Sequence, residues 1–166
     1  MHNITVKDFP NLDLGDKRRD ERFIKIIENI VRHPGSSIPQ HSDRWYDTKA
    51  TYEFFKNEDI TLDSIGAAIG SYGASQLKES RVLVIHDTST ISYNDLQADG
   101  LGYIDNAAGK GIFCHSSIAA TVSGTPLALL NQIIWSRELS EWGKSAGGHK
   151  KPFEQKESYK WYDGIA

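Results

Sequence analysis

The sequence contains very little cysteine and proline, with one Cys and five Pro among 166 residues. A single cysteine cannot form an internal disulfide, which excludes a disulfide-stapled secreted scaffold. The sequence also lacks an apolar N-terminal segment and any apolar run of about 18 residues, so neither a secretory signal nor a membrane-spanning helix is predicted. We therefore expect a cytoplasmic protein with one sizeable core, or one core and part of a second.

Several catalytic signatures are missing as well. The one G-x-S-x-G match, "GKSAG" at 143–147, lies in a polar, Lys-rich stretch and not between a strand and a helix, so no nucleophile elbow is predicted and a hydrolase of the α/β class is disfavoured. The glycine pairs "GLG" and "GKG" do not sit between a strand and a helix, so no phosphate-binding or dinucleotide-binding loop is predicted. Cys114 and His115 lack the spacing of zinc ligands. The classes that depend on these motifs are therefore disfavoured.

The charge balance is uneven along the chain. The net charge of −3 and the pI near 6.1 argue weakly against a nucleic-acid binder when the whole chain is averaged. Residues 16–56, however, carry nine Lys or Arg against seven Asp or Glu, whereas residues 57–110 carry three against eight. A mildly basic front part therefore precedes an acidic middle.

The front part begins with a strong helix signal. Residues 16–32 are predicted to form a helix, because Asp16 can cap the first turn and "HPG" at 33–35 stops it. Its apolar residues recur at helical spacing: Phe23, Ile26, Ile27, Ile30 and Val31.

Cations gather on the other side of this helix. At about 100° per residue, Arg18, Arg22, Lys25 and Arg32 share one stripe. The pattern alone allows a solvated face with i,i+4 pairing or a nucleic-acid-binding face.

Two further helices are expected at 43–57 and 62–78. In the first, Trp45, Tyr52 and Phe55 can share a face, and we interpret these rings as core and not as base-stacking platforms. Residues 81–86, 112–122 and 127–135 read as strands, with a Gly, Asn and Asp-rich loop at 94–110. The short links predict an antiparallel meander, followed by a polar loop at 138–157 and a helical piece at 156–165.

The first strand leads into "RVLVIHDTSTISY", residues 81–93. Residues 82–85 are all aliphatic, as expected for a strand covered on both faces, so Asp87 is presented by a rigid element. A strand-borne carboxylate suits a hard cation such as Mg²⁺. The alternative is a turn through "DTST", in which the hydroxyl groups bond the backbone. His86 and Asp87 point to opposite faces of a strand, so they cannot share one proton relay.

Five segments in order along the chain are similar to a known family. They are "LGDKRRDER" (14–22), "TYEFFKN" (51–57), "IHDTSTISY" (85–93), "HSSI" (115–118) and "KESYKW" (156–161). The chain resembles the bacterial cut-and-paste insertion-sequence transposases of the type carried by composite transposon Tn-five. Those enzymes have a DDE active site on an RNase H-like fold.

The resemblance implies roles for particular residues. It makes the N-terminal helical region a transposon-end binder, with these DNA-contact candidates: Arg18, Arg19, Arg22, Lys25 and Arg32. It makes Asp87 the first catalytic, metal-binding Asp. His86 stands where the family pattern usually has an acidic residue.

The implied fold class is α+β, with a helical DNA-binding region at 1–78 and the first three antiparallel strands of an incomplete RNase H-like domain at 79–166. The resemblance places the second Asp and the Glu on elements after Ala166. One carboxylate cannot hold two metal ions about 4 Å apart, so we expect this chain alone to be inactive. Mg²⁺ or Mn²⁺ is expected for the full-length parent, and weak binding or none for this chain.

The function expected from the resemblance is that of the N-terminal part of a DDE transposase, which binds transposon-end DNA and carries the first Asp of a metal-dependent cleavage and strand-transfer site. The alternative is a non-catalytic DNA-binding or protein-interaction module derived from a transposase. The implied partner is double-stranded transposon-end DNA, with a dimer in the synaptic complex as an option and no membrane association. The implied location is the bacterial cytoplasm, at the nucleoid.

Overall fold

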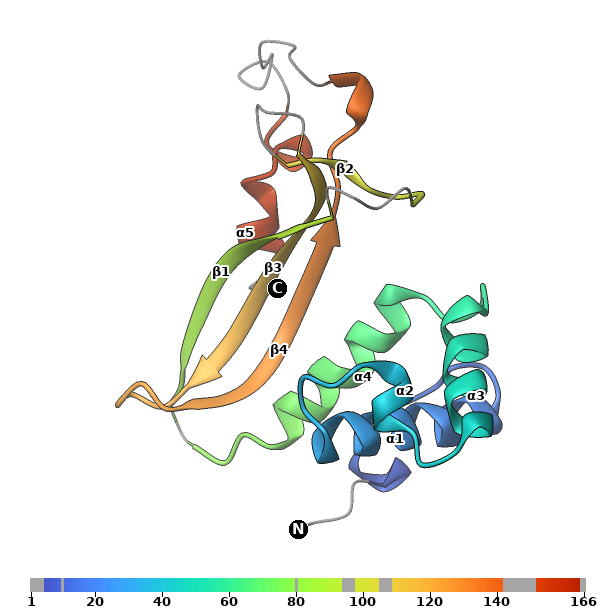
Figure 1. Cartoon of the computed structure of the whole chain (residues 1–166). Helices are drawn as coiled ribbons and strands as arrows, with labels where there is room; N and C mark the ends of the chain where they lie inside the picture. The colour runs from blue at the N-terminus through green and yellow to red at the C-terminus, as the bar shows by residue number, and fades with distance from the viewer. Residues whose placement is uncertain are drawn as a thin grey trace. The chain divides into compact units, whose positions relative to one another are not determined.

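The computed structural model describes residues 5–9, 11–79, 81–93, 98–104, 109–141 and 152–164. The chain forms two compact units, Met1–Ser75 and Gln76–Ala166 (Figure 1). The first is helical and the second contains an antiparallel sheet of four strands, so the α+β class is confirmed. The assignment of the second unit to the RNase H-like fold stays a prediction.

The helical unit is built from four α-helices and a short 3-10 helix. They are η1 (Val6–Asp8), α1 (Lys17–Arg32), α2 (Ile38–His41), α3 (Trp45–Lys56) and α4 (Leu62–Ser75). Asp16 caps α1 by accepting a hydrogen bond from the Arg18 backbone N–H, as the sequence predicts. The short helix α2 was not predicted, and it starts at a capping box in which Ser37 and Gln40 bond reciprocally.

Aromatic and aliphatic side chains form the core of this unit. The ring of Phe23 meets Phe9 edge-on at 5.7 Å between centroids and stacks with Phe54 at 6.4 Å. The buried apolar residues are Phe9, Leu14, Phe23, Ile24, Ile26, Phe54 and Ala68. The predicted inner face of α1 is partly wrong, because Ile30 and Val31 are exposed.

The predicted inner face of α3 is also wrong. Trp45 is 76% exposed and Tyr52 is 44% exposed, and Phe55 lies beside an apolar cavity of about 170 Å³ between α1, α2 and α3. The side chains that α3 buries are instead Asp47, Thr48, Thr51 and Phe54. The helix therefore turns Asp47 and two threonines inward together with Phe54, and it turns Trp45 and Tyr52 outward.

The three predicted strands of the second unit form an antiparallel meander, and a short fourth strand lies within the predicted loop at 94–110, where none was expected. The strands of this unit are β1 (Leu83–Ser92), β2 (Gly102–Tyr103), β3 (Lys110–Ala120) and β4 (Pro126–Trp135). Strand β3 pairs with β1 along one side and with β4 and the short β2 along the other. Short helices follow: η2 (Leu139–Glu141), η4 (Phe153–Gln155) and α5 (Tyr159–Asp163). Parts of the predicted loops at 94–110 and 138–157 lie outside the described residues.

Strand β1 differs from the prediction in length and burial. It continues through "DTST" to Ser92, and Leu83, Val84 and Ile85 are each about half exposed. Among the described strands β1 has one neighbour, β3, so it forms an edge of the sheet. The expectation of a strand covered on both faces is therefore wrong in the part of the chain that the structure describes.

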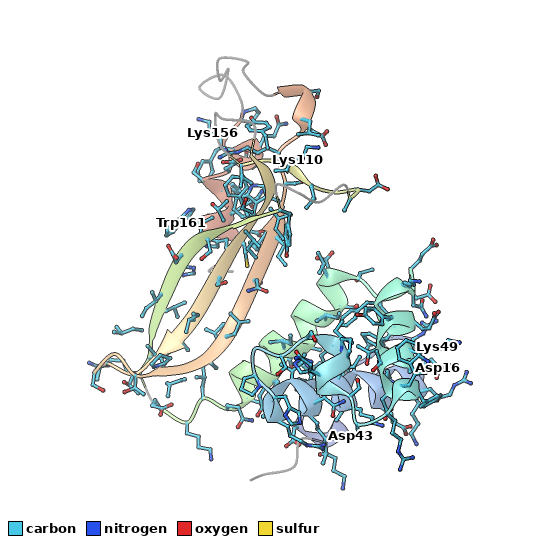
Figure 2. The ribbon with its side chains drawn as sticks, in the orientation of Figure 1. Asp16, Asp43, Lys49, Lys110, Lys156 and Trp161 are labelled. Atoms are coloured by element: carbon cyan, nitrogen blue, oxygen red, sulfur yellow. The ribbon has the colours of Figure 1, made fainter. Side chains whose placement is uncertain are left out.

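Helix α5 packs on the sheet face that carries His86 and His115. The Trp161 ring lies 4.8 Å from the fully buried ring of His115, between centroids. Ser117 Oγ donates to the carbonyl of Gly164 at 3.2 Å and also bonds His86 Nδ1 at 2.9 Å. A Cβ at Gly164 would meet Ser117 Oγ at 3.0 Å, so glycine permits this close approach. Figure 2 shows Trp161 on the same side of the sheet as the α5 ribbon.

Candidate functional site

Every cation of α1 takes part in an ion pair. These pairs are Lys17 with Glu21, Arg18 with Asp16, Arg19 with Asp59, Arg22 and Lys25 with Asp47, and Arg32 with Glu28. Two of them have the i,i+4 spacing of a solvated helix face. The five predicted DNA contacts therefore all lie in or beside the first helix, but none is an unpaired cation.

Asp47 is the most buried of these carboxylates, with 6% of the residue exposed. Lys25 Nζ donates to its Oδ1 at 2.5 Å and Arg22 Nη1 donates to the same atom at 3.2 Å. The hydrogen bond from Lys25, assisted by Arg22, lowers the pKa of Asp47, although burial acts in the opposite direction. The Arg22 guanidinium also lies 5.7 Å from the centre of the Tyr46 ring. Arg22 and Lys25 therefore hold α1 against α3.

The other predicted contacts on α1 differ in accessibility. Arg19 donates to the Leu14 carbonyl at 3.0 Å and to Asp59 at 2.5 Å, so its side chain fixes the turn before the helix. Arg18 and Arg32 are exposed, and their pairs with neighbouring carboxylates are of the weak surface kind. A phosphate can replace such a partner at small cost, so these two remain accessible to an anion.

The cations of α3 are arranged differently from those of α1. Among the described residues, Arg44, Lys49 and Lys56 take part in no ion pair, and all three are exposed. Figure 2 shows Lys49 extending outward from α3. These three residues were not among the predicted DNA contacts, although positions 45, 49, 52 and 56 have the spacing of one helical stripe. It was missed because the aromatic residues of the stripe were assigned to the core.

In the sheet unit, Asp87 lies in the middle of β1 and is exposed. It pairs across the sheet with Ser116, which pairs in turn with Gln132, so a carboxylate, a hydroxyl and an amide form one row. The alternative of a turn through "DTST" is wrong, because these residues continue the strand and Thr88 Oγ1 bonds His115 Nδ1 at 2.8 Å. His86 bonds Ser117 on the opposite face, away from Asp87.

This row offers one charged ligand for a metal ion. Within the described ranges, no group of three or more His, Cys, Asp or Glu side chains is placed to hold a metal. Ser116 and Gln132 supply neutral oxygens, which do not offset the cost of dehydrating Mg²⁺ as carboxylates do. The described residues therefore do not complete a two-metal site.

The geometry defines a helical unit in which α3 presents exposed cations and exposed aromatic side chains, joined in sequence to a sheet unit with one exposed strand carboxylate. Such a helical surface is typical of DNA-binding units. Residues 1–60 match the family model described as transposase DNA-binding, and this match covers η1 to α3. It supports a transposase-derived DNA-binding region with DNA as its partner. No described helix has the length and apolar character needed to cross a membrane.

Proposed function

We propose that the helical unit binds duplex DNA at transposon ends. We also propose that the sheet unit is the first part of an RNase H-like domain of a DDE transposase, of the insertion-sequence type related to composite transposon Tn-five. The observation that carries the first part is the match of residues 1–60 to the transposase DNA-binding family. The five ordered segments of similarity, which extend to residue 161, support the second part.

Asp87 is the proposed first metal-binding carboxylate of that site. Its support is geometric, because the side chain is exposed and the middle of a paired strand fixes its backbone. Together with further carboxylates, Asp87 would hold Mg²⁺ or Mn²⁺, and the chemistry such an ion would supply is activation of the nucleophile and stabilisation of charge on the phosphate. The role of Asp87 in this chain is to present a hard anionic oxygen on a face that His86 does not share.

A second candidate is a non-catalytic DNA-binding or protein-interaction module derived from a transposase. The observation that favours it is that the described residues place no second carboxylate in a metal-holding group with Asp87. In this reading the helical unit has the same DNA-binding role, and the sheet unit serves as a contact surface.

DNA binding by the whole chain is expected to depend steeply on salt. Each phosphate that a cation neutralises contributes about −0.9 to the slope of log K against log [salt]. The measurement is fluorescence anisotropy of a labelled mixed-sequence 30-bp duplex, titrated with the full chain between about 50 and 200 mM KCl. Binding that does not develop even at the lowest salt would contradict the proposed function.

Metal binding at Asp87 is expected to be weak and local. One carboxylate offsets only a small part of the free energy needed to remove water from a hard cation. Mn²⁺ should therefore bind with a dissociation constant in roughly the millimolar range or weaker. Paramagnetic broadening of backbone NMR signals should then centre on Asp87, Ser116 and Gln132, and Asp87→Asn should remove it. Asp63→Asn, which makes the same charge change in the first turn of α4, is the matched control. Broadening that persists in Asp87→Asn would rule out this carboxylate as the ligand.

A further inference from the structure

One face of α3 alternates aromatic and cationic side chains. Trp45, Lys49, Tyr52 and Lys56 follow one another at intervals of four, three and four residues. At 3.6 residues per turn these positions fall within an arc of about 60°. We call this set the α3 stripe. It lies opposite the buried Asp47 and Phe54, so it forms the outermost line of the helix.

The α3 stripe has no role in the core of the helical unit. Trp45 and Tyr52 are exposed, although aromatic rings of this size usually bury most of their surface. The unit already contains a complete aromatic cluster around Phe23, to which neither ring belongs. Exposed aromatic residues placed together are typical of a contact surface.

The charges of this stripe suit an anionic partner. Lys49 and Lys56, and Arg44 at the N-cap of α3, have no carboxylate partner among the described residues, whereas all α1 cations do. Binding a polyanion to α3 therefore breaks no described ion pair. Binding it to Arg22 and Lys25 would remove the partners of a buried carboxylate.

The dimensions of α3 suit the major groove of duplex DNA. From Trp45 to Lys56 the helix rises by about 17 Å at 1.5 Å per residue. The major groove is about 12 Å wide and admits an α-helix, so cations at both ends of this helix can reach phosphates on its two sides. Between them, Trp45 and Tyr52 can make apolar contacts with base edges such as the thymine methyl group.

We propose that the α3 stripe, together with Arg44, is the surface that enters the major groove, and that Arg22 and Lys25 of α1 hold this helix in place. The proposal rests on the proposed function, because it takes duplex DNA as the partner. It moves the principal contacts from α1, where the sequence placed them, to α3.

The charge contribution is tested with two matched double variants of the full chain. Lys49→Ala/Lys56→Ala removes two exposed cations from the α3 stripe, and Lys17→Ala/Arg18→Ala removes two exposed cations from α1. With a labelled mixed-sequence 30-bp duplex, the first variant should lower the magnitude of the salt slope by about 1.8 and weaken binding roughly 60-fold at 0.1 M salt. The second variant should weaken binding and lower the salt slope less than the first, because a carboxylate already pairs with each of its two cations.

The aromatic contribution is tested with Trp45→Ala/Tyr52→Ala. Both rings are exposed, so the helical circular dichroism and the thermal midpoint should stay close to those of the unchanged chain. Duplex affinity should fall severalfold with the salt slope retained, because the lost contacts are apolar. Unchanged affinity in this variant would overturn the contribution of the rings.

Three further results separate the two levels of the proposal. If the unchanged chain does not bind the duplex, the proposed function itself is wrong. If the α1 double variant weakens duplex binding as much as the α3 double variant does, the α3 stripe is not the principal contact surface, but the proposed function stands. Tighter binding to a 30-nucleotide oligo(dT) than to the duplex overturns the groove assignment, because stacking rings then act on single strands.

Discussion

Replacing both Lys25 and Arg22 with methionine should lower the free energy of unfolding of the helical unit by about 3–5 kcal/mol, because Asp47 is then a buried carboxylate without a partner. Methionine keeps an unbranched apolar stem at both positions, so the change is mainly the loss of the two charged ends. The measurement is a urea titration followed by hydrogen exchange of peptides from α1 and α3.

A third substitution separates the charge from the packing. Adding Asp47→Asn to the two methionine changes removes the buried anion, so most of the lost stability should return. If the double methionine variant loses less than about 1 kcal/mol, Asp47 has the energetics of an ordinary surface carboxylate. In that case α1 and α3 are held together by their apolar contacts, such as Phe23 against Phe54.

The same ion pairs give the helical unit an acid-sensitive stability. The pKa of Asp47 is lowered in the folded state, chiefly by the hydrogen bond from Lys25. The stabilisation is therefore fully present above the unfolded pKa of about 3.9, and it is lost as the pH falls through the lower folded pKa. The variant that carries Asp47→Asn should lack this contribution to acid unfolding.

Acidification from about pH 7.5 to pH 5 should destabilise the sheet unit through His115, by up to about 1.4 kcal/mol per pH unit. His115 is fully buried, and burial lowers its pKa, assisted by the neighbouring His86 and opposed by Asp87. In the unfolded chain this imidazole gains a proton below about pH 6.5, whereas the folded state resists protonation. The stabilisation is therefore complete above that pH and is lost as the pH falls toward the folded pKa.

Tryptophan fluorescence can follow this unit alone in a Trp45→Phe background, because the remaining three tryptophans lie within 76–166. His115→Gln should flatten the dependence of the urea midpoint on pH, since an amide does not titrate in this range. The hydrogen bond from Arg137 lowers the pKa of Glu157. The contribution of this ion pair to the stability of the sheet unit is therefore lost only below about pH 4.5, outside the range of this experiment. A urea midpoint that stays constant from pH 7.5 to pH 5 would show that His115 is accessible to protons in the folded state.

Local signals in the sequence predicted most of the elements. The range of α1 was correct because Asp16 as N-cap, the apolar period and the "HPG" stop all act within a few residues of the helix. The antiparallel order of the strands was also predictable, since short turns join β3 to β4. The match of residues 1–60 to the transposase DNA-binding family model supports DNA as the partner of this region.

The orientation of α3 could not be predicted from its own residues. The aromatic residues on one face of this helix predicted that Trp45 and Tyr52 point inward. Asp47 instead faces Arg22 and Lys25, which are more than 20 residues away in sequence. This pairing between helices decides which face is buried. The length of β1 also depends on distant residues. The residue types of "DTST" are common in turns, but this segment is extended because it pairs with β3.

The open edge of β1 has a consequence for handling the protein. Its outer backbone N–H and C=O groups face no described strand, and the flanking side chains from Leu83 to Ile85 are apolar and half exposed. A strand from another molecule can form hydrogen bonds with such an open edge, and repeated pairing of this kind leads to aggregation. A charged side chain on the edge strand opposes that pairing. Asp87 supplies that charge in the middle of the strand. The Asp87→Asn protein is therefore best purified and compared at low concentration, with its mass in solution checked by light scattering.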